Sequence, residues 1–309
     1  MRRSRRTQML APLALCLAIT AVTAVAMGGV TLGAAGPSAV NPAFLPLGDG
    51  KVTTSGARRG YVYACRTGFI PAGGPHRGGG AQVEGPWIHG ETYDLTAKAT
   101  VDGSVHWPGA KLRESRSRRW LSFRGNGLPK WATTGEFPIS AGDDAYAYDH
   151  NPNSIRSQSV RYSLPRRPKK ASWPGCLSGG PIGIAKNGVA IFNALDAEDR
   201  DAVAHETQDH CGGHPQRLGI YHYHAIPSCL TRGASKRRAS GLVGWALDGY
   251  PIYGPRGHGG KLLTNEDLDA CHGQTSKVFY EGRWQRIYHY SATLEYPYTL
   301  GCYHGTPQA

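Results

Sequence analysis

The chain has 309 residues, of which 42 are glycine and 21 are proline. This share of turn-forming residues argues against a helical bundle or a coiled coil, and the length allows at most about two domains. Hydrophobic residues make up 40% of the chain and charged residues 18%, which excludes wholesale disorder. The formal net charge of +13 comes without a nucleic-acid-binding motif, so we expect a solvated basic surface and no nucleic-acid partner.

The N-terminus has the pattern of an export signal. Four arginines within the first six residues precede the apolar stretch 10–30, and no further charged residue occurs before Asp49. This order predicts a signal peptide over residues 1–39 and a secreted protein. The apolar run is also long enough to span a bilayer, so the alternative is an uncleaved membrane anchor with the rest of the chain facing outside.

Composition divides the remainder of the chain into three parts. Residues 40–60 are rich in glycine, proline and small residues, which predicts a linker. Residues 61–170 contain short apolar and aromatic runs broken by glycine and proline, which is typical of a β-rich region. Residues 171–309 carry the motifs described below, and we expect this core region to pack with the preceding region as one unit.

Two hairpins are predicted in the core region. Residues 181–192 contain Asn187-Gly188 between two apolar runs, and residues 242–253 contain Asp248-Gly249 in the same position. Both dipeptides accommodate the positive φ angles of a tight type I′ turn. Pro251 cannot donate a hydrogen bond to a neighbouring strand, so we expect its strand to lie at the edge of a sheet.

One main helix is predicted, from Asn193 to about Thr207. Acidic residues in its early turns complement the helix dipole, and Asn193 or Asp196 can cap its N-terminus. With the hairpins, this gives an α+β fold class that is predominantly β, a sheet-rich fold stapled by disulfides with about one main helix.

A sequence pattern occurs twice in the core region. Asp-x-Cys-x-Gly, then Tyr-His-Tyr, then a further cysteine are found within residues 209–229 and again within residues 269–302. The repetition suggests two similar substructures.

Six cysteines remain once the signal segment is set aside, and an even number in an exported chain predicts disulfides. The count alone leaves fifteen full pairings open. The repeated pattern suggests the local pairs Cys211 with Cys229 and Cys271 with Cys302, which leaves Cys65 with Cys176.

The most specific motif is Tyr221-His222-Tyr223-His224. Side chains alternate between the two faces of a strand, so both histidines point one way and both tyrosines the other. Two imidazoles on one strand face are well suited to hold a transition metal, zinc or copper. His214 and His205 lie just upstream and are candidate further ligands.

Two acidic residues beside these histidines are candidate catalytic groups. With a metal-bound water, Glu206 or Asp209 would act as general base in a hydrolase or lyase. The alternative is a non-enzymatic extracellular binding module with structural histidines. Such a module would hold a glycan or an anionic cell-wall polymer through its basic surface and exposed aromatics such as Trp87, Trp107 and Trp120.

Two basic runs bear on this alternative. The simplest interpretation of residues 111–119 and 166–170 is that they form loops or exposed strand faces. The more specific interpretation is a docking site for polyanions.

Further motifs accompany Tyr221 to His224 in the same part of the chain. They are Gly125-Asn126-Gly127-Leu128-Pro129, Gly135-Glu136-Phe137-Pro138, Asn151-Pro152-Asn153, Gly180-Pro181-Ile182-Gly183, Ala204-His205-Glu206, Asp209-His210-Cys211-Gly212-Gly213-His214-Pro215, Leu247-Asp248-Gly249-Tyr250-Pro251-Ile252-Tyr253-Gly254 and Tyr296-Pro297-Tyr298-Thr299. Through these motifs the chain resembles the YHYH-domain proteins from about Gly125 to Gly305. The resemblance implies membership of that family and no particular reaction.

Overall fold

Short strands dominate the computed structural model, which describes residues 40–68, 83–231 and 235–308. The predominantly β, α+β fold class is therefore confirmed. The signal peptide or anchor expected over residues 1–39 lies outside the described residues. Among the helices of the described part, none has the length and apolar character needed to cross a membrane.

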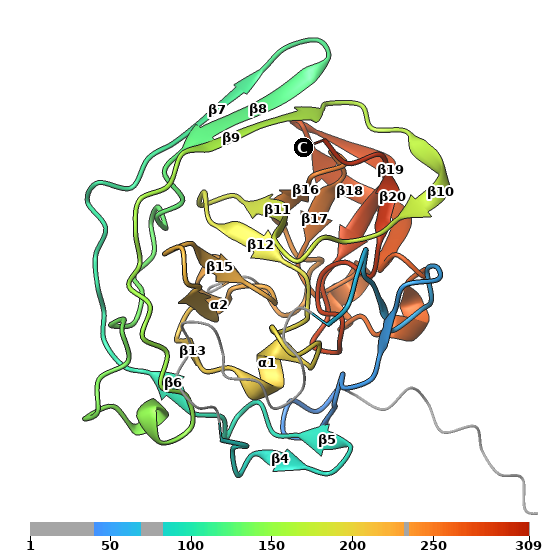
Figure 1. Cartoon of the computed structure of the whole chain (residues 1–309). Coiled ribbons are helices and arrows are strands. Elements are labelled where there is room, and N and C mark those ends of the chain that lie inside the picture. Colours follow the sequence, from blue (N-terminus) through green and yellow to red (C-terminus); the bar gives the residue numbers. More distant parts are fainter. Residues whose placement is uncertain (1–39, 69–82, 232–234, 309) are drawn as a thin grey trace, which may run out of the picture. The chain divides into compact units, whose positions relative to one another are not determined.

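An eight-stranded sheet forms the centre of the fold (Figure 1). Neighbouring strands pair in parallel at β12–β15 and β17–β19 and antiparallel everywhere else, so the pattern is the same counted from either edge. The sheet thus consists of two similar four-stranded halves that meet at β11 and β16, as the repeated pattern suggested. In sheet order the strands are β14 (Gly213–Pro215), β15 (Tyr221–Tyr223), β12 (Ala190–Phe192), β11 (Pro181–Ala185), β16 (Leu242–Ala246), β17 (Pro251–Tyr253), β19 (Arg283–Ser291) and β18 (Gly273–Tyr280).

Smaller sheets and short helices complete the fold. Strands β7, β8 and β9 form a three-stranded sheet whose buried side chains Leu121, Phe123 and Leu164 belong to the main core. The remaining elements, in chain order, are β1 (Leu45–Pro46), β2 (Val52–Thr53), β3 (Val62–Tyr63), β4 (Ile88–His89), β5 (Thr92–Tyr93), β6 (Thr100–Val101), β7 (Leu112–Arg116), β8 (Trp120–Gly125), the 3-10 helix η1 (Asp144–Ala147), β9 (Val160–Pro165), β10 (Lys170–Gly175), α1 (Ala202–His205), β13 (Gln208–Asp209), α2 (Ser228–Thr231), the 3-10 helices η2 (His258–Gly260) and η3 (Asn265–Asp267), and β20 (Tyr303–Gly305).

Both expected hairpins are present, β11–β12 and β16–β17. The expected type I′ turn is wrong, because each loop has four residues and only its glycine has a positive φ, 92° at Gly188 and 89° at Gly249. In each loop the glycine N–H donates to an alanine carbonyl, Ala185 or Ala246, over 2.9 Å. The two hairpins therefore share one turn geometry.

The expectation of an edge strand at Pro251 is also wrong, because β17 lies between β16 and β19. Pro251 is the first residue of β17, and the parallel pairing with β19 begins one residue later, at Ile252 with Tyr290. The missing N–H at Pro251 therefore breaks no ladder hydrogen bond.

The expected main helix is much shorter than predicted. Only Ala202–His205 is helical, and Asp201 caps it by accepting hydrogen bonds from the N–H groups of Val203 and Ala204. Upstream, the Asp196 side chain accepts from the N–H groups of Glu198 and Arg200, each at 2.8 Å. Such local side-chain acceptors stabilise a turn in place of helix.

The linker expected over residues 40–60 is instead part of the folded core. Leu45 is 1% exposed and belongs to the main hydrophobic cluster together with Leu47. Gly48 donates its N–H to the buried carboxylate of Asp201 over 2.9 Å. The segment therefore packs against the residues that lead into α1.

The three expected disulfides are confirmed: Cys65–Cys176, Cys211–Cys229 and Cys271–Cys302. The last two occupy equivalent places in the two halves of the sheet. In the chain-entropy account each contributes on the order of 3 to 5 kcal/mol.

The two hairpin turns bind equivalent tyrosines of the two halves. The side-chain amide of Asn187 donates a hydrogen bond to the Tyr223 hydroxyl over 3.0 Å, and the Tyr290 hydroxyl donates one to the Asp248 carboxylate over 2.6 Å. Asp248 is 0% exposed, and this burial raises its pKa to about 6. Above that pH the folded protein must keep a charge buried.

We predict that replacing Asp248 with Asn, the residue at the equivalent turn, removes this pH dependence. A raised pKa in the folded state means that the carboxyl group costs stability when ionised and ceases to do so once it is protonated. Relative to Asp248→Asn, the wild type should gain up to about 3 kcal/mol of unfolding free energy as the pH falls from about 7 to about 4. Urea unfolding across this range measures the difference.

The matched control is Asp144→Asn, at an exposed carboxylate. Its difference from the wild type should change far less over the same range. A pH-independent difference for Asp248→Asn would contradict the prediction.

Candidate metal centre

Three imidazoles meet on one face of the β14–β15 pair. His214 lies directly opposite His222, and His224 follows two residues later on the same face. Their ligand atoms all lie within 4.8 Å of one another, and the three residues are only 3 to 4% exposed. Tyr221 and Tyr223 point into the hydrophobic core on the opposite face, as the strand alternation predicts.

Backbone carbonyls set the protonation of two of these rings. The Nδ1 atom of His222 contacts the carbonyl oxygen of Ile220 at 3.1 Å, and Nδ1 of His224 contacts that of Asn193. A carbonyl can only accept, so each neutral ring carries its proton on Nδ1 and presents a lone pair at Nε2. The two Nε2 atoms are 3.0 Å apart. Two lone pairs at this distance repel unless a proton or a metal ion lies between them.

A buried carboxylate completes the cluster. Glu206 immediately follows α1, and its Oε2 atom lies 3.3 Å from Nε2 of both His214 and His224. This oxygen and both ring nitrogens of His214 have no hydrogen-bond partner. Buried polar atoms without partners are costly, and a metal ion would give them partners.

Burial controls the electrostatics of the cluster. It lowers the pKa of His214 and His222 well below the ordinary value, so both rings are neutral at physiological pH. Burial also lowers the pKa of His224, but the neighbouring Glu206 more than offsets this effect, so that the net shift is upward. Burial raises the pKa of Glu206. Nearby, the buried ammonium of Lys98 donates a hydrogen bond to the backbone carbonyl oxygen of Glu206 over 2.6 Å.

His205, expected as a fourth ligand, is not in the cluster. Its Nε2 atom pairs with the Asp49 carboxylate at 2.8 Å. The predicted helix continued to about Thr207, but α1 ends at His205. The chain therefore turns Glu206 toward the imidazoles and His205 away from them.

Asp209, expected as a candidate general base, instead holds the site together. Its carboxylate accepts hydrogen bonds from the Tyr221 hydroxyl at 2.7 Å and from the N–H groups of Gly135, Cys211 and Gly213 at 2.9 to 3.2 Å. A carboxylate with four donors is occupied as an acceptor and is not placed to take a proton from water. We call this arrangement the Asp209 clasp.

The second half of the sheet repeats the clasp without the histidine cluster. Asp269 accepts from the N–H groups of Cys271 and Gly273 at 2.9 Å and from the Tyr288 hydroxyl at 3.2 Å. The positions of His214, His222 and His224 are occupied there by Gln274, His289 and Ser291. The side chains of this second set are joined by ordinary hydrogen bonds: Gln274 to Ser291 at 3.1 Å, Ser276 to His289 at 2.8 Å and Ser291 to His289 at 3.2 Å.

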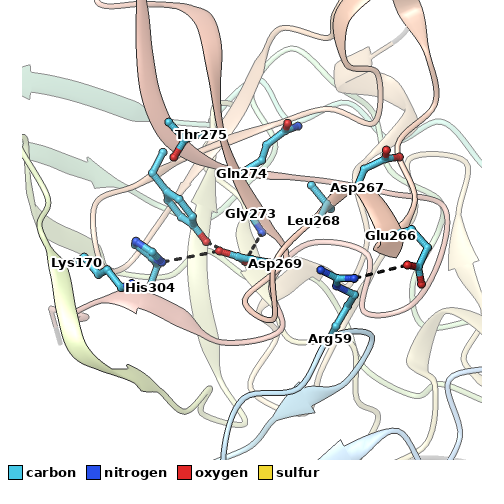
Figure 2. Close-up of a pocket in the computed structure, with 11 residues that line it drawn as sticks. Arg59, Lys170, Glu266, Asp267, Leu268, Asp269, Gly273, Gln274, Thr275 and His304 are labelled. Atoms are coloured by element: carbon cyan, nitrogen blue, oxygen red, sulfur yellow. Dashed lines mark hydrogen bonds and ion pairs between the residues drawn. The ribbon is translucent and has the colours of Figure 1, made fainter.

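A pocket of about 550 Å³ lies over this second clasp (Figure 2). Most of its charged side chains pair with each other. Nη1 of Arg59 lies 3.5 Å from Oε2 of Glu266, and Nδ1 of His304 lies 4.0 Å from Oδ2 of Asp269. The His304 ring also stacks on Tyr288 with 3.6 Å between centroids. Because most of its charges have partners, this pocket is a weaker candidate site than the histidine cluster.

The three tryptophans expected to bind a glycan differ in their exposure to solvent. Trp87 is only 2% exposed and donates its indole N–H to the Ala204 carbonyl, so it is a core residue. Trp107 is half-buried and donates to the Thr134 hydroxyl. Trp120 is 43% exposed. Only the last of these three is available at the surface.

Three contributors to the site have no signal in the sequence. Two are the carbonyl groups of Ile220 and Asn193, since every residue has a carbonyl. The third is Phe192, which stacks on His222 with 4.0 Å between ring centroids. Its position beside the ring follows from the parallel pairing of β12 with β15, which only the fold reveals.

Comparison with known proteins identifies one family. The model described as YHYH protein matches residues 161–263, a stretch that contains the whole histidine cluster, Glu206, and Asp209 with all its hydrogen-bond donors except Gly135. Searches of curated proteins and of solved structures found no match.

We predict that Gly213→Ala disrupts the Asp209 clasp. A Cβ at this position would overlap the Tyr221 ring and hydroxyl. Displacing a buried ring in this way should lower the unfolding free energy by about 1 to 3 kcal/mol. Urea unfolding measures the loss.

Gly142→Ala is the control, because a Cβ there meets no atom within 4 Å. It should change stability by no more than about 0.5 kcal/mol. Equal effects of the two substitutions would show that the clasp does not constrain the strand.

Proposed function

We propose that this YHYH-domain-containing protein is an exported metal-binding protein that holds one transition-metal ion between His214, His222, His224 and Glu206. The observation that carries the proposal is the convergence of two Nε2 lone pairs, 3.0 Å apart, beside a buried carboxylate oxygen that has no hydrogen-bond partner. Export is supported by the three disulfides, which persist in oxidising compartments, and by the N-terminal sequence pattern.

Three of the spacings between ligand atoms are close to those around a four-coordinate ion. Metal–nitrogen bonds of about 2.0 to 2.1 Å in tetrahedral geometry place ligand atoms roughly 3.3 Å apart. The Nε2–Nε2 distance of 3.0 Å and the two Glu206–imidazole distances of 3.3 Å are close to this value. The carbonyl groups behind His222 and His224 are the outer partners that orient ligating imidazoles.

Zinc is the ion that this donor set favours. Imidazole binds both zinc and copper, but three nitrogens and one carboxylate oxygen in a tetrahedral arrangement suit zinc better than copper(II), which prefers tetragonal geometry. The bound ion would neutralise the buried carboxylate and tie the end of α1 to β14 and β15.

The same geometry favours a stabilising role over hydrolysis. Four protein ligands close a tetrahedral site, whereas a catalytic zinc keeps one position for water. Of the two acids considered as general base, Glu206 faces the imidazoles and Asp209 is held by four donors. We therefore assign the ion to the folding and rigidity of the domain.

We predict that His214→Ala, His222→Ala and His224→Ala each remove most of the bound metal. Loss of one imidazole from a four-ligand site destroys its geometry. Elemental analysis of purified protein without a histidine tag gives the metal content, and thermal unfolding with and without chelator should show stabilisation by the ion only in proteins that retain the site.

Two histidines outside the cluster are internal controls. His205→Ala removes a ring paired with Asp49, and His289→Ala removes the ring equivalent to His222 in the second half. Both should keep stoichiometric metal. A wild-type protein without metal, and without rebinding after chelation, would overturn the proposal.

Glu206→Gln tests whether the carboxylate is a ligand or a base. A neutral amide of the same shape cannot replace a carboxylate ligand, so we predict a loss of zinc affinity of at least about 10-fold. Competition with a chromophoric chelator measures the affinity. If Glu206 acted only as a base, the substitution would leave zinc affinity unchanged.

A further inference from the structure

The sheet of β7, β8 and β9 carries three arginines in one row. Arg124 on β8 lies directly opposite Arg113 on β7 and Arg161 on β9, so all three side chains project from the same face of the sheet. All three are exposed. With strands about 4.8 Å apart, three guanidinium groups emerge side by side within roughly 10 Å.

Two further rows continue this face toward the β7–β8 turn. Ser115, Ser122 and Ser163 form the next row, with 3.4 Å between the hydroxyls of Ser122 and Ser163. Trp120 follows opposite Pro165, and 43% of this tryptophan is exposed. Successive rows are about 7 Å apart. The face thus presents cations, hydroxyls and an aromatic ring in order.

The composition of this face is costly to the fold. Like charges directly opposite one another in a sheet are destabilising. The strand positions on this face contain no acidic residue, and Glu114, the one acid in these strands, lies opposite the core residue Phe123 and pairs with Arg116. On the other face, Leu121, Phe123 and Leu164 pack into the main core.

We propose that this face binds an anionic glycan, with oxyanion groups on the arginine row, sugar hydroxyls on the serine row and a sugar ring against Trp120. Guanidinium groups bind carboxylate, sulfate and phosphate with paired hydrogen bonds. Serine hydroxyls donate and accept and so match sugar hydroxyls. The indole offers a rigid apolar surface to the C–H face of a sugar ring.

Other anionic partners use less of this face. A linear polyphosphate has neither hydroxyls nor rings and would leave Trp120 without a role. An anionic membrane would require several apolar side chains to insert. On the outward strand positions Trp120 and Pro165 are the apolar side chains, beside three serines and three arginines. The glycan is the occupant that engages all three rows.

The test measures binding of the full chain to heparin, with neutral dextran as the uncharged comparison. We expect the wild type to bind heparin in a salt-dependent manner and not to bind dextran. The triple variant Arg113→Gln, Arg124→Gln, Arg161→Gln should lose at least 10-fold in affinity. Its melting temperature should equal or exceed that of the wild type at low salt, because repulsion within the row is relieved.

The matched control removes the same charge elsewhere. Lys236→Gln, Arg237→Gln, Arg238→Gln alters an exposed basic run outside this sheet and should reduce heparin affinity less than threefold. Trp120→Ala should weaken binding several-fold without changing its salt dependence, whereas Trp131→Ala, at a tryptophan that is 76% exposed, should have no effect.

Four results would overturn the proposal: no heparin binding, an equal loss in both triple variants, a lower melting temperature of the arginine-row variant, or polyphosphate binding as tight as heparin binding and indifferent to Trp120→Ala. The last result would identify a phosphate polymer as the ligand.

Discussion

An aspartate in each half of the central sheet, buried in the first half and half-exposed in the second, ties a tight turn to the first tyrosine of a Tyr-His-Tyr strand. Asp209 and Asp269 each accept hydrogen bonds from two backbone N–H groups of the turn and from one tyrosine hydroxyl. The clasp fixes the strand face from which the tyrosines point toward the core. Because side chains alternate along a strand, it also fixes the histidines on the opposite face, and a slip of one residue would exchange the two sets.

The two halves show how one frame supports different chemistry. The shared parts are the clasp, the disulfide, the hairpin and the bond between the hairpin turn and the last tyrosine of the motif. The changed positions are the histidines: Gln274 and Ser291 stand where His214 and His224 do. An amide and a hydroxyl satisfy each other by hydrogen bonds, whereas the converging imidazoles of the first half could hold a metal ion.

Features encoded by neighbouring residues could be predicted from the sequence. The hairpins follow from Asn187-Gly188 and Asp248-Gly249, and the shared face of His222 and His224 follows from the strand period. The local disulfides follow from the repeated pattern. Features that depend on long-range packing could not be predicted. The helix was predicted too long because Asn193 and Asp196 were counted as helix-start signals. The Asp196 side chain instead stabilises a turn, and the short helix that forms is capped by Asp201.

That one difference explains the errors at the site. With α1 ending at His205, Glu206 becomes a candidate ligand and His205 a partner of Asp49, a residue 156 positions away that the sequence analysis placed in a linker. Of the arginine row, only Arg113 belongs to a basic run of the sequence, and Arg124 and Arg161 lie between the two runs. Its alignment depends on the register of three strands, which no local pattern sets.

The central claim is that three imidazoles and one carboxylate surround a single metal ion. Anomalous diffraction from crystals of the untagged protein, recorded on both sides of the zinc absorption edge, tests it most directly. We predict one strong edge-dependent peak about 2.0 to 2.1 Å from Nε2 of His222 and His224, with a His214 nitrogen and a Glu206 oxygen completing the shell. A peak elsewhere, or no peak at this cluster in protein supplied with zinc, would contradict the account.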